Sequence, residues 1–130
     1  MPNLEHVTPP GVAPAPGYTH VVVGTGRLVS ISGQVAFDEA GRLVGPGDPE
    51  AQARQVFENL SRCLAAVGAT FDDVVKLTYF VTDIASMNAI RRVRDELIDV
   101  STLPSSTAVV VAGLILPELL MEIEALAVIP

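Results

Sequence analysis

The sequence contains no tryptophan and only one cysteine, Cys63, among its 130 residues. A single cysteine excludes an internal disulfide bond, so a hydrophobic core must stabilise the fold, and a chain of this length can supply one. No apolar stretch reaches the roughly 20 residues that a membrane-spanning helix requires. The N-terminal residues also lack the charged and apolar regions of a signal peptide. We therefore expect a cytoplasmic protein with no membrane partner.

Positive charge is scarce, because 8 lysines and arginines face 15 aspartates and glutamates, which gives a net charge of -7. An acidic surface repels phosphate backbones, and the arginines of residues 91–94 are too few to reverse this, so we expect no nucleic-acid partner. His6 and His20 have no ligand-type residues at metal-binding spacing, which argues against a zinc site. A Ser-His-Asp triad is also disfavoured, because no nucleophile-elbow motif is present.

Hydrophobic residues make up 49% of the chain, and their spacing predicts where secondary structure forms. Residues 1–16 carry five prolines and are predicted to form an extended arm. Residues 18–37, YTHVVVGTGRLVSISGQVAF, contain two β-branched runs separated by Gly24-Thr25-Gly26, which predicts a β-hairpin. The missing third glycine argues against a nucleotide-binding loop there.

A helix is predicted to begin at Asp48 and Pro49, which suit the N-cap and the first helical position. Its apolar stripe follows helical spacing as far as Val67, and Gly68 marks its end. Cys63 falls on this stripe, so we expect a buried side chain and not a nucleophile.

The second half of the chain alternates strand and helix patterns. Residues 72–83 read as a strand, Ser86 is expected to cap a second helix, and that helix must end before Pro104. Two strands, at about 106–112 and 119–128, complete the order ββ-α-β-α-ββ within a single domain spanning 1–130. This order predicts an α+β fold with two helices on one face of a mixed sheet. The other face, being rich in apolar residues, is expected to contact another subunit.

Glu122 and Glu124 are the most suggestive candidates for chemistry. Strand alternation places them on one face with Leu126 and Val128. Crowding and desolvation there would favour the protonated form of at least one acid, as a general acid–base group requires. The alternative is that this face is solvated and that the two acids have no chemical role.

Three further positions allow either a functional or a structural interpretation. Gly33 interrupts a strand, which either permits close approach of a ligand or forms a plain bulge. Tyr18 either folds over a pocket or simply packs. Ser106 and Thr107 either bind a ligand or satisfy backbone groups at a sheet edge.

Several segments in this order resemble the Rid family, also called YjgF or L-PSP: PGYTHVV, VSISGQVAF, AQARQVFENLSRCLAAVGATFDDVVKLTYFVTDI and MEIEALAV. The resemblance implies a chorismate-mutase-like fold and a homotrimer that binds a small-molecule ligand in clefts between neighbouring subunits. It also implies hydrolysis of reactive imines and enamines to 2-oxo acids and ammonia, without a cofactor or a metal.

The resemblance also implies roles for individual residues. Tyr18 and the strand residues Ser32, Gly33 and Gln34 would shape the cleft, and Glu122 would order or activate water. Glu124 is the second acid of the same sequence pattern. The arginine with which the family holds the substrate carboxylate is replaced here by Ser106, which is followed by Thr107.

This replacement bears on the substrate, because a neutral hydroxyl contributes about 0.5–1.5 kcal/mol and a charged donor about 1.5–3 kcal/mol. Either the substrate is not a simple 2-imino acid, or Arg91 or Arg27 supplies the missing charge. The first alternative is the simpler one. A trimer that binds a small ligand without catalysis is the alternative function, and an endoribonuclease is less favoured because of the net negative charge.

Overall fold

The computed structural model describes residues 3–130. It contains eight principal elements: β1 (Leu4–Val7), β2 (Val21–Gly24), β3 (Arg27–Gln34), α1 (Pro49–Ala65), β4 (Val74–Val81), α2 (Ser86–Leu97), β5 (Ser105–Val110) and β6 (Met121–Ile129). Short 3₁₀ turns at Phe71–Asp73 and Val100–Thr102 precede β4 and β5.

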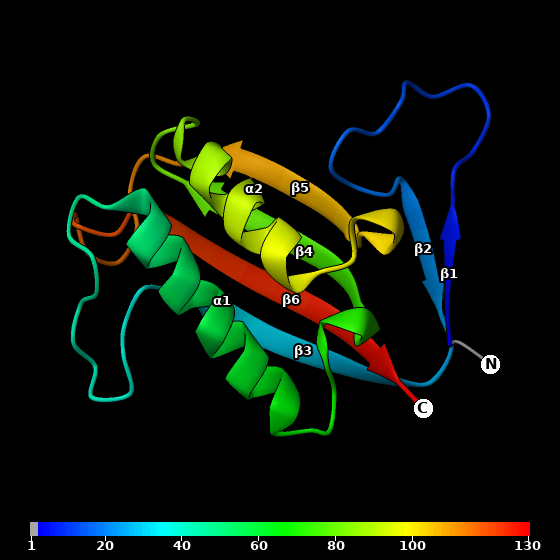
Figure 1. The fold of residues 1–130 in the computed structure, drawn as a ribbon, viewed down its shortest axis with the longest axis horizontal. Coiled ribbons are helices and arrows are strands. Elements are labelled where there is room, and N and C mark those ends of the chain that lie inside the picture. The colour runs from blue at the N-terminus through cyan, green and yellow to red at the C-terminus, as the bar shows by residue number, and fades with distance from the viewer. Residues whose placement is uncertain (1–2) are drawn as a thin grey trace.

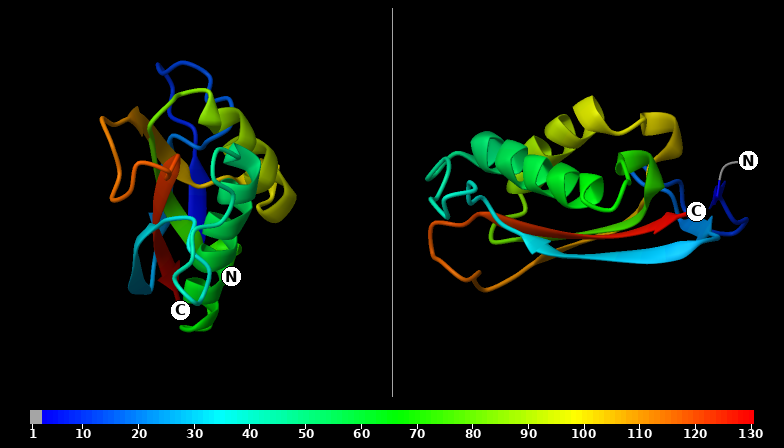
Figure 2. Two further views of the ribbon diagram at one scale, coloured as in Figure 1. Left: turned by 90° about the vertical axis from the view of Figure 1, so that its left-hand side faces the viewer. Right: turned by 90° about the horizontal axis from the view of Figure 1, so that it is seen from below.

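The main sheet has the strand order β3-β6-β4-β5. β6 is antiparallel to both of its neighbours, whereas β5 runs parallel to β4 after the crossover through α2. Both helices lie on the same face of this sheet, and the opposite face is uncovered (Figures 1 and 2). The expected α+β architecture with two helices on one face of a mixed sheet is therefore confirmed.

Helix α1 begins and ends as its sequence predicts. The Asp48 side chain accepts a hydrogen bond of 3.1 Å from the backbone N–H of Ala51, and Pro49 occupies the first turn. Gly68 adopts a φ of 73°, a left-handed conformation that favours glycine after a helix. Val67 lies beyond the last helical residue and is exposed, so the apolar face of α1 is shorter than predicted. Cys63 lies on that face but is only half-buried, whereas a buried side chain was expected.

The predicted hairpin between the two N-terminal β-branched runs is wrong. β2 pairs with β1, and β3 pairs instead with β6, so the two runs belong to different sheets. Gly26 explains the separation, because its φ is 141° and a Cβ there would overlap the carbonyl oxygen of Ile129. The chain therefore passes tightly over the end of β6 where a hairpin turn was expected.

The predicted extended arm, residues 1–16, is also only partly correct. Leu4–Val7 form a strand antiparallel to β2, with His6 opposite Val22. The arm thus supplies the partner that the expected hairpin would have given to β2. Residues 1 and 2 of the predicted arm lie outside the described residues.

Helix α2 does not begin with the predicted cap. Ser86 is the first helical residue and is buried, while Ala85 precedes it without a capping side chain. The turn is stabilised instead by Asp83, whose carboxylate accepts a 2.9 Å hydrogen bond from the backbone of Ala85. No helix within residues 3–130 is both long and apolar enough to cross a membrane.

Alternation along β6 separates the core from the uncovered face of the sheet. Met121, Ile123 and Ala125 are buried beneath the helices. The intervening Glu122 and Glu124 point to the uncovered face, as predicted, because successive strand residues face opposite sides. That face also carries large exposed apolar side chains, namely Leu28, Val109 and Leu126.

Candidate functional site

Tyr18 is held beside the start of β5 by its neighbours in sequence. The backbone N–H of Thr19 donates to the carbonyl of Pro104 at 3.2 Å, and the Thr19 hydroxyl donates to the carbonyl of Leu103 at 2.5 Å. From the other side, the Arg94 guanidinium donates to the carbonyl of Gly17 at 2.8 Å. Three hydrogen bonds therefore fix the segment that carries Tyr18 between α2 and β5.

A pocket of about 340 Å³ lies between this segment, α2 and the edge strand β5. We call it the Tyr18 pocket. Its polar lining residues are Tyr18, Tyr79, Arg91, Arg94, Ser106 and Thr107. The structure thus brings together three residues that the sequence singled out, namely Tyr18, Arg91 and Ser106. Thr107 also borders the pocket, but its side chain points to the uncovered face, because it is in register with Thr78.

The three hydroxyl residues that open β5 have different partners. The Ser105 hydroxyl donates to the carbonyl of Val75 at 2.9 Å, and the Thr107 hydroxyl accepts a 2.8 Å hydrogen bond from the Lys76 ammonium. Ser106 makes no side-chain hydrogen bond with another of the described residues. Its hydroxyl is therefore available to a ligand in the Tyr18 pocket.

Arg91 and Arg27 were the two cations considered as substitutes for the missing arginine, and they lie in different places. Arg91 lines the Tyr18 pocket with Ser106 and forms no ion pair within residues 3–130. Arg27 pairs with Ile129 at the far end of β3, where its Nε donates to the carbonyl of Pro130 at 3.4 Å. The pocket around Ser106 therefore contains a guanidinium group, contributed by α2.

Arg94 and Tyr79 form the buried part of the same pocket. Arg94 is only 4% exposed and donates from Nε and one terminal nitrogen to the Asp95 carboxylate, at 3.0 and 2.9 Å. Tyr79 is 1% exposed, and its hydroxyl has no hydrogen-bond partner among residues 3–130. Burial raises the pKa of this phenol, and the nearby Arg94 charge partly opposes the rise, so the hydroxyl is neutral at physiological pH.

Glu122 lies beside Gly33, on the neighbouring strand β3. A Cβ at Gly33 would lie 2.7 Å from Cδ and 2.8 Å from Cγ of Glu122, closer than real contacts allow. The register of β3 against β6 also shifts between Ile31 and Gln34, so Gly33 sits in a bulge. The structural interpretation of Gly33 is therefore confirmed: it lies in a bulge, and its missing Cβ leaves room for the Glu122 side chain, while close approach of a ligand stays a prediction.

Glu122 and Ser106 lie on opposite faces of the sheet. Ser106 is in register with the buried Leu77, on the side of the helices, whereas Glu122 is in register with Phe80 on the uncovered face. Because alternate strand residues point to opposite faces, one chain does not bring these two side chains together.

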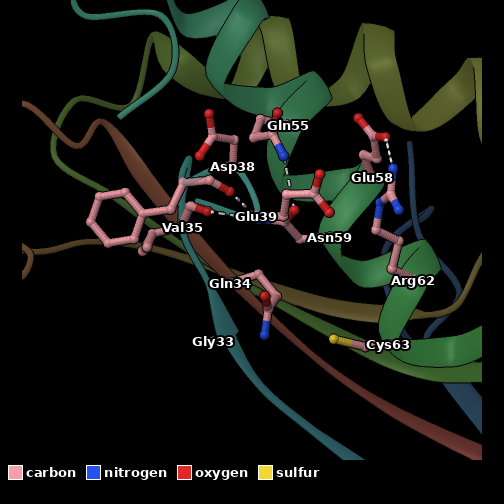
Figure 3. A pocket seen from close by; sticks show the side chains of 11 residues that line it. Gly33, Gln34, Val35, Asp38, Glu39, Gln55, Glu58, Asn59, Arg62 and Cys63 are labelled. Carbon is pink, nitrogen blue, oxygen red and sulfur yellow. Dashed lines mark hydrogen bonds and ion pairs between the residues drawn. The ribbon is translucent and has the colours of Figure 1, made fainter. Parts of the chain in front are cut away.

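The strand residues Ser32, Gly33 and Gln34 lie away from the Tyr18 pocket. Gly33 and Gln34 line a second cavity, of about 480 Å³, between the end of β3, the following loop and α1 (Figure 3). Asn59 fixes this loop, because its side-chain amide donates to the carbonyls of Val35 and Phe37 at 3.1 and 3.0 Å. The Ser32 carbonyl accepts from the Gln34 side chain at 3.1 Å.

The histidines have structural partners. A ring nitrogen of His20 lies 2.7 Å from the carbonyl of Ala13, and the ring meets that of Tyr18 edge to face at a centroid distance of 5.2 Å. Within residues 3–130, no three His, Cys, Asp or Glu side chains are grouped so that they could hold a metal ion.

Two lining residues, Tyr79 and Arg94, escaped sequence reasoning. Tyr79 reads as an ordinary strand residue, and nothing in the sequence shows that its hydroxyl is unpartnered. Arg94 had a detectable signal, because it lies three positions after Arg91 and residues at this spacing share a helix face.

Comparison with known proteins agrees with this geometry. The family profile described as Endoribonuclease L-PSP matches residues 10–129. The chain is 35% identical over 121 residues to the RutC family protein slr0709 of Synechocystis, covering 91% of this chain and 92% of that protein. It is 38% identical over 93 residues to the RutC family protein YjgH of Escherichia coli, covering 71% and 70% of the two chains.

Solved structures give the same result. The Rid family protein YyfB of Yersinia pestis superimposes with a TM-score of 0.86 at 35% identity, covering 98% of this chain and 99% of the other. RidA from Psychrobacter superimposes with a TM-score of 0.72 at 35% identity, covering 86% and 88%. The fold is the chorismate-mutase-like α+β fold that the sequence led us to expect. This chain belongs to the Rid family, also known as YjgF or L-PSP.

Proposed function

We propose that this protein is a Rid-type hydrolase that converts small imines or enamines to carbonyl products and ammonia, with Glu122 activating the attacking water. The observation that carries the proposal is the position of Glu122. Its carboxylate lies against the Gly33 backbone on the uncovered face of the sheet, where no residue within 3–130 forms an ion pair with it.

The proposed reaction requires one proton acceptor and one place for the substrate. An enamine first tautomerises to the imine. Glu122 then accepts a proton from water while the water oxygen bonds to the imine carbon, and the protonated Glu122 returns that proton to the nitrogen. In the resulting carbinolamine the hydroxyl proton passes to the nitrogen, the C=O bond forms as the C–N bond breaks, and ammonia leaves. Positioned proton transfer of this kind typically contributes 100- to 10,000-fold to the rate.

A complete site of this kind needs two subunits. The Tyr18 pocket opens beside β5 on the helix side, and Glu122 lies on the other face of the same sheet. We therefore propose a homotrimer in which the Tyr18 pocket of one subunit meets Glu122 of its neighbour. Support comes from the exposed apolar side chains of the uncovered face, including Leu28 at 70% exposure, which an interface would bury.

The substrate was expected to lack a carboxylate, because Ser106 replaces the arginine of the family pattern. Arg91 in the same pocket weakens this argument, since it supplies a positive charge from α2. The variant Ser106→Arg separates the two cases. Activity on 2-aminoacrylate that appears only in this variant would mean that the native pocket lacks an anion-binding charge. Activity already present in the native protein would mean that Arg91 suffices.

The test of the proposed chemistry is ammonia release from 2-aminoacrylate and from a panel of neutral imines. Glu122→Gln should lower kcat/KM by about 100-fold or more. Glu124→Gln is the matched control, because this acid lies two residues further along the same face and is exposed, and it should remain close to native. Full activity of Glu122→Gln on a substrate that the native protein hydrolyses would disprove the role of Glu122.

A trimer that binds a ligand without catalysis is the second candidate. It is favoured by the separation of Glu122 from the Tyr18 pocket within one chain, because a ligand bound in that pocket need not meet the carboxylate. Thermal-shift screening followed by recovery of the ligand distinguishes the two functions. A ligand that raises Tm and is recovered unchanged supports binding alone, and sedimentation analysis of the same samples tests the trimer.

A further inference from the structure

The hydroxyl of Tyr79 is a buried polar group that the described fold leaves without a partner. Such groups are uncommon, because leaving a buried donor unpaired costs roughly 1–3 kcal/mol in stability. A phenylalanine at this position would avoid that cost while packing in the same space. The hydroxyl therefore needs a reason beyond the stability of the ligand-free chain.

Its position supplies a reason, because Tyr79 forms part of the wall of the Tyr18 pocket. The phenol lies near the guanidinium groups of Arg94 and Arg91, whose positive charges both act on its pKa. Arg94 donates well-formed hydrogen bonds to Asp95 and to the Gly17 carbonyl, and it also approaches the Tyr79 hydroxyl closely enough to lower the phenol pKa as a donor, although no contact there meets hydrogen-bond geometry. Arg91 is exposed and unpaired among the described residues, so its side chain is free to move as a ligand enters.

The surrounding charge also fixes what the hydroxyl can recognise. Guanidinium groups are donors only, so they orient the phenol oxygen toward themselves and turn its proton away. Because burial raises the pKa of the phenol, the proton is retained. The O–H therefore keeps its proton and has no acceptor among the described residues. Because its oxygen is shielded from solvent, a ligand meets it only when the pocket wall moves, and beside two cations the acceptor that gains most is a carboxylate oxygen.

We propose that Tyr79 is a specificity-determining residue, whose hydroxyl donates to a carboxylate oxygen at the inner end of the ligand while Arg91 supplies the opposite charge. The proposal concerns only ligand binding in the Tyr18 pocket. It rests on the proposed Rid-type function only in taking the bound carboxylate to belong to a substrate of that reaction. It assigns anion recognition to β4 and α2, whereas the strand β5 contributes only the neutral Ser106 to the same pocket.

The experiment is a binding titration with pyruvate and with its neutral amide, pyruvamide, followed by NMR chemical shifts of the full-length native protein. Pyruvate should bind at least tenfold more tightly than pyruvamide. Tyr79→Phe should weaken pyruvate binding by roughly tenfold or more, as expected for loss of a hydrogen bond to a charged acceptor. Arg91→Gln should weaken it similarly.

The ligand-free proteins provide the decisive control. Removing an unpartnered hydroxyl should leave the Tm of Tyr79→Phe equal to or above that of the native protein, whereas a purely structural hydroxyl would lower it. Arg92→Gln is the matched control for Arg91, because Arg92 lies next to it on α2, pairs with Glu50 at 3.4 Å and does not line the pocket. It should bind pyruvate as the native protein does.

Three results would overturn the proposal: a Tm of ligand-free Tyr79→Phe several degrees below native, unchanged pyruvate binding by that variant, or no saturable preference of the native protein for pyruvate over pyruvamide. Failure of the proposed reaction gives a different pattern. In that case no ammonia is released from any substrate, yet pyruvate binding still depends on Tyr79 and Arg91.

Discussion

Gly33→Ala is the substitution that most directly tests how the fold positions Glu122. The added methyl carbon would lie 2.7 Å from Cδ and 2.8 Å from Cγ of Glu122, with an oxygen closer still. Carbon atoms pack best at about 3.5–4.0 Å, so the carboxylate must move by about 1 Å or more. Gly33 is not among the glycines with positive φ, so its backbone accepts alanine without strain.

The expected magnitudes differ for activity and stability. A displacement of about 1 Å in a reacting group can cost on the order of 100-fold in rate, so kcat for ammonia release should fall by that factor. Stability should change little, because the half-exposed Glu122 side chain can rotate outward at a cost of about 0.5–1.5 kcal/mol. For a chain of this size, that corresponds to a fall in Tm of roughly 2–6 °C.

A double-mutant cycle separates the clash from other effects of the methyl group. In the Glu122→Ala background, the atoms that would meet the new methyl are absent. Gly33→Ala should then be neutral or stabilising by up to about 1 kcal/mol, as expected for a glycine replaced at a compatible backbone position. Kinetics and urea unfolding of the four proteins provide the measurement. Native activity of Gly33→Ala, or an equal loss of stability in both backgrounds, would refute the reasoning.

Two further predictions concern the framework around the site. The side chain of Gln52 is fully buried and donates to the carbonyls of Gly45 and Glu118 at 3.1 and 3.0 Å. It also accepts a 2.9 Å hydrogen bond from the backbone N–H of Leu120. Because Gln52→Ala removes all three bonds, it should lower the free energy of unfolding in urea by about 3–5 kcal/mol. Gln55→Ala, which breaks one side-chain hydrogen bond on the same helix, should cost under about 1 kcal/mol, and equal costs would contradict this account. Hydrogen bonds from the backbone and hydroxyl of Ser101 lower the pKa of Asp99 below its ordinary value of 3.8, so this contribution is present above pH 3.8 and is lost as the pH falls further. The Tm difference between native protein and Asp99→Ala should therefore shrink between pH 5 and the acid limit, and a constant difference would argue against it.

Much of the secondary structure could be predicted because, in these segments, the residues that mark element ends agree with the spacing of the apolar residues. Asp48, Pro49 and Gly68 mark the ends of α1, and strict alternation in β6 places Glu122 and Glu124 on one face. Where local signals conflict with long-range packing, the predictions failed. The glycines of residues 24–26 are typical of a turn, but the structure requires Gly26 for another reason: the end of β6 packs against its backbone and leaves no room for a Cβ.

The candidate site was predictable only in part for the same reason. Tyr18 and Ser106 were singled out from the sequence, with their roles implied by the resemblance, and the structure places both in one pocket. The pocket wall formed by Tyr79 and Arg94 depends on packing of α2 against β4, which no short segment of sequence encodes. The placement of Glu122 on the opposite face required the register of all four strands.

By itself, the sequence determined the class of the protein: an acidic α+β chain of the Rid family, with two amphipathic helices and an alternating acidic strand. The acidic composition, the helices and the alternating strand follow from composition and periodicity, which act over a few residues at a time, whereas the family follows from the resemblance of whole segments to known proteins. Only the tertiary structure decided that Arg91 shares a pocket with Ser106, that the Tyr79 hydroxyl lacks a partner in the described part of the chain, and that Glu122 faces away from both. Such facts depend on which distant segments are brought into contact, because hydrogen bonding and charge act across space and not along the chain.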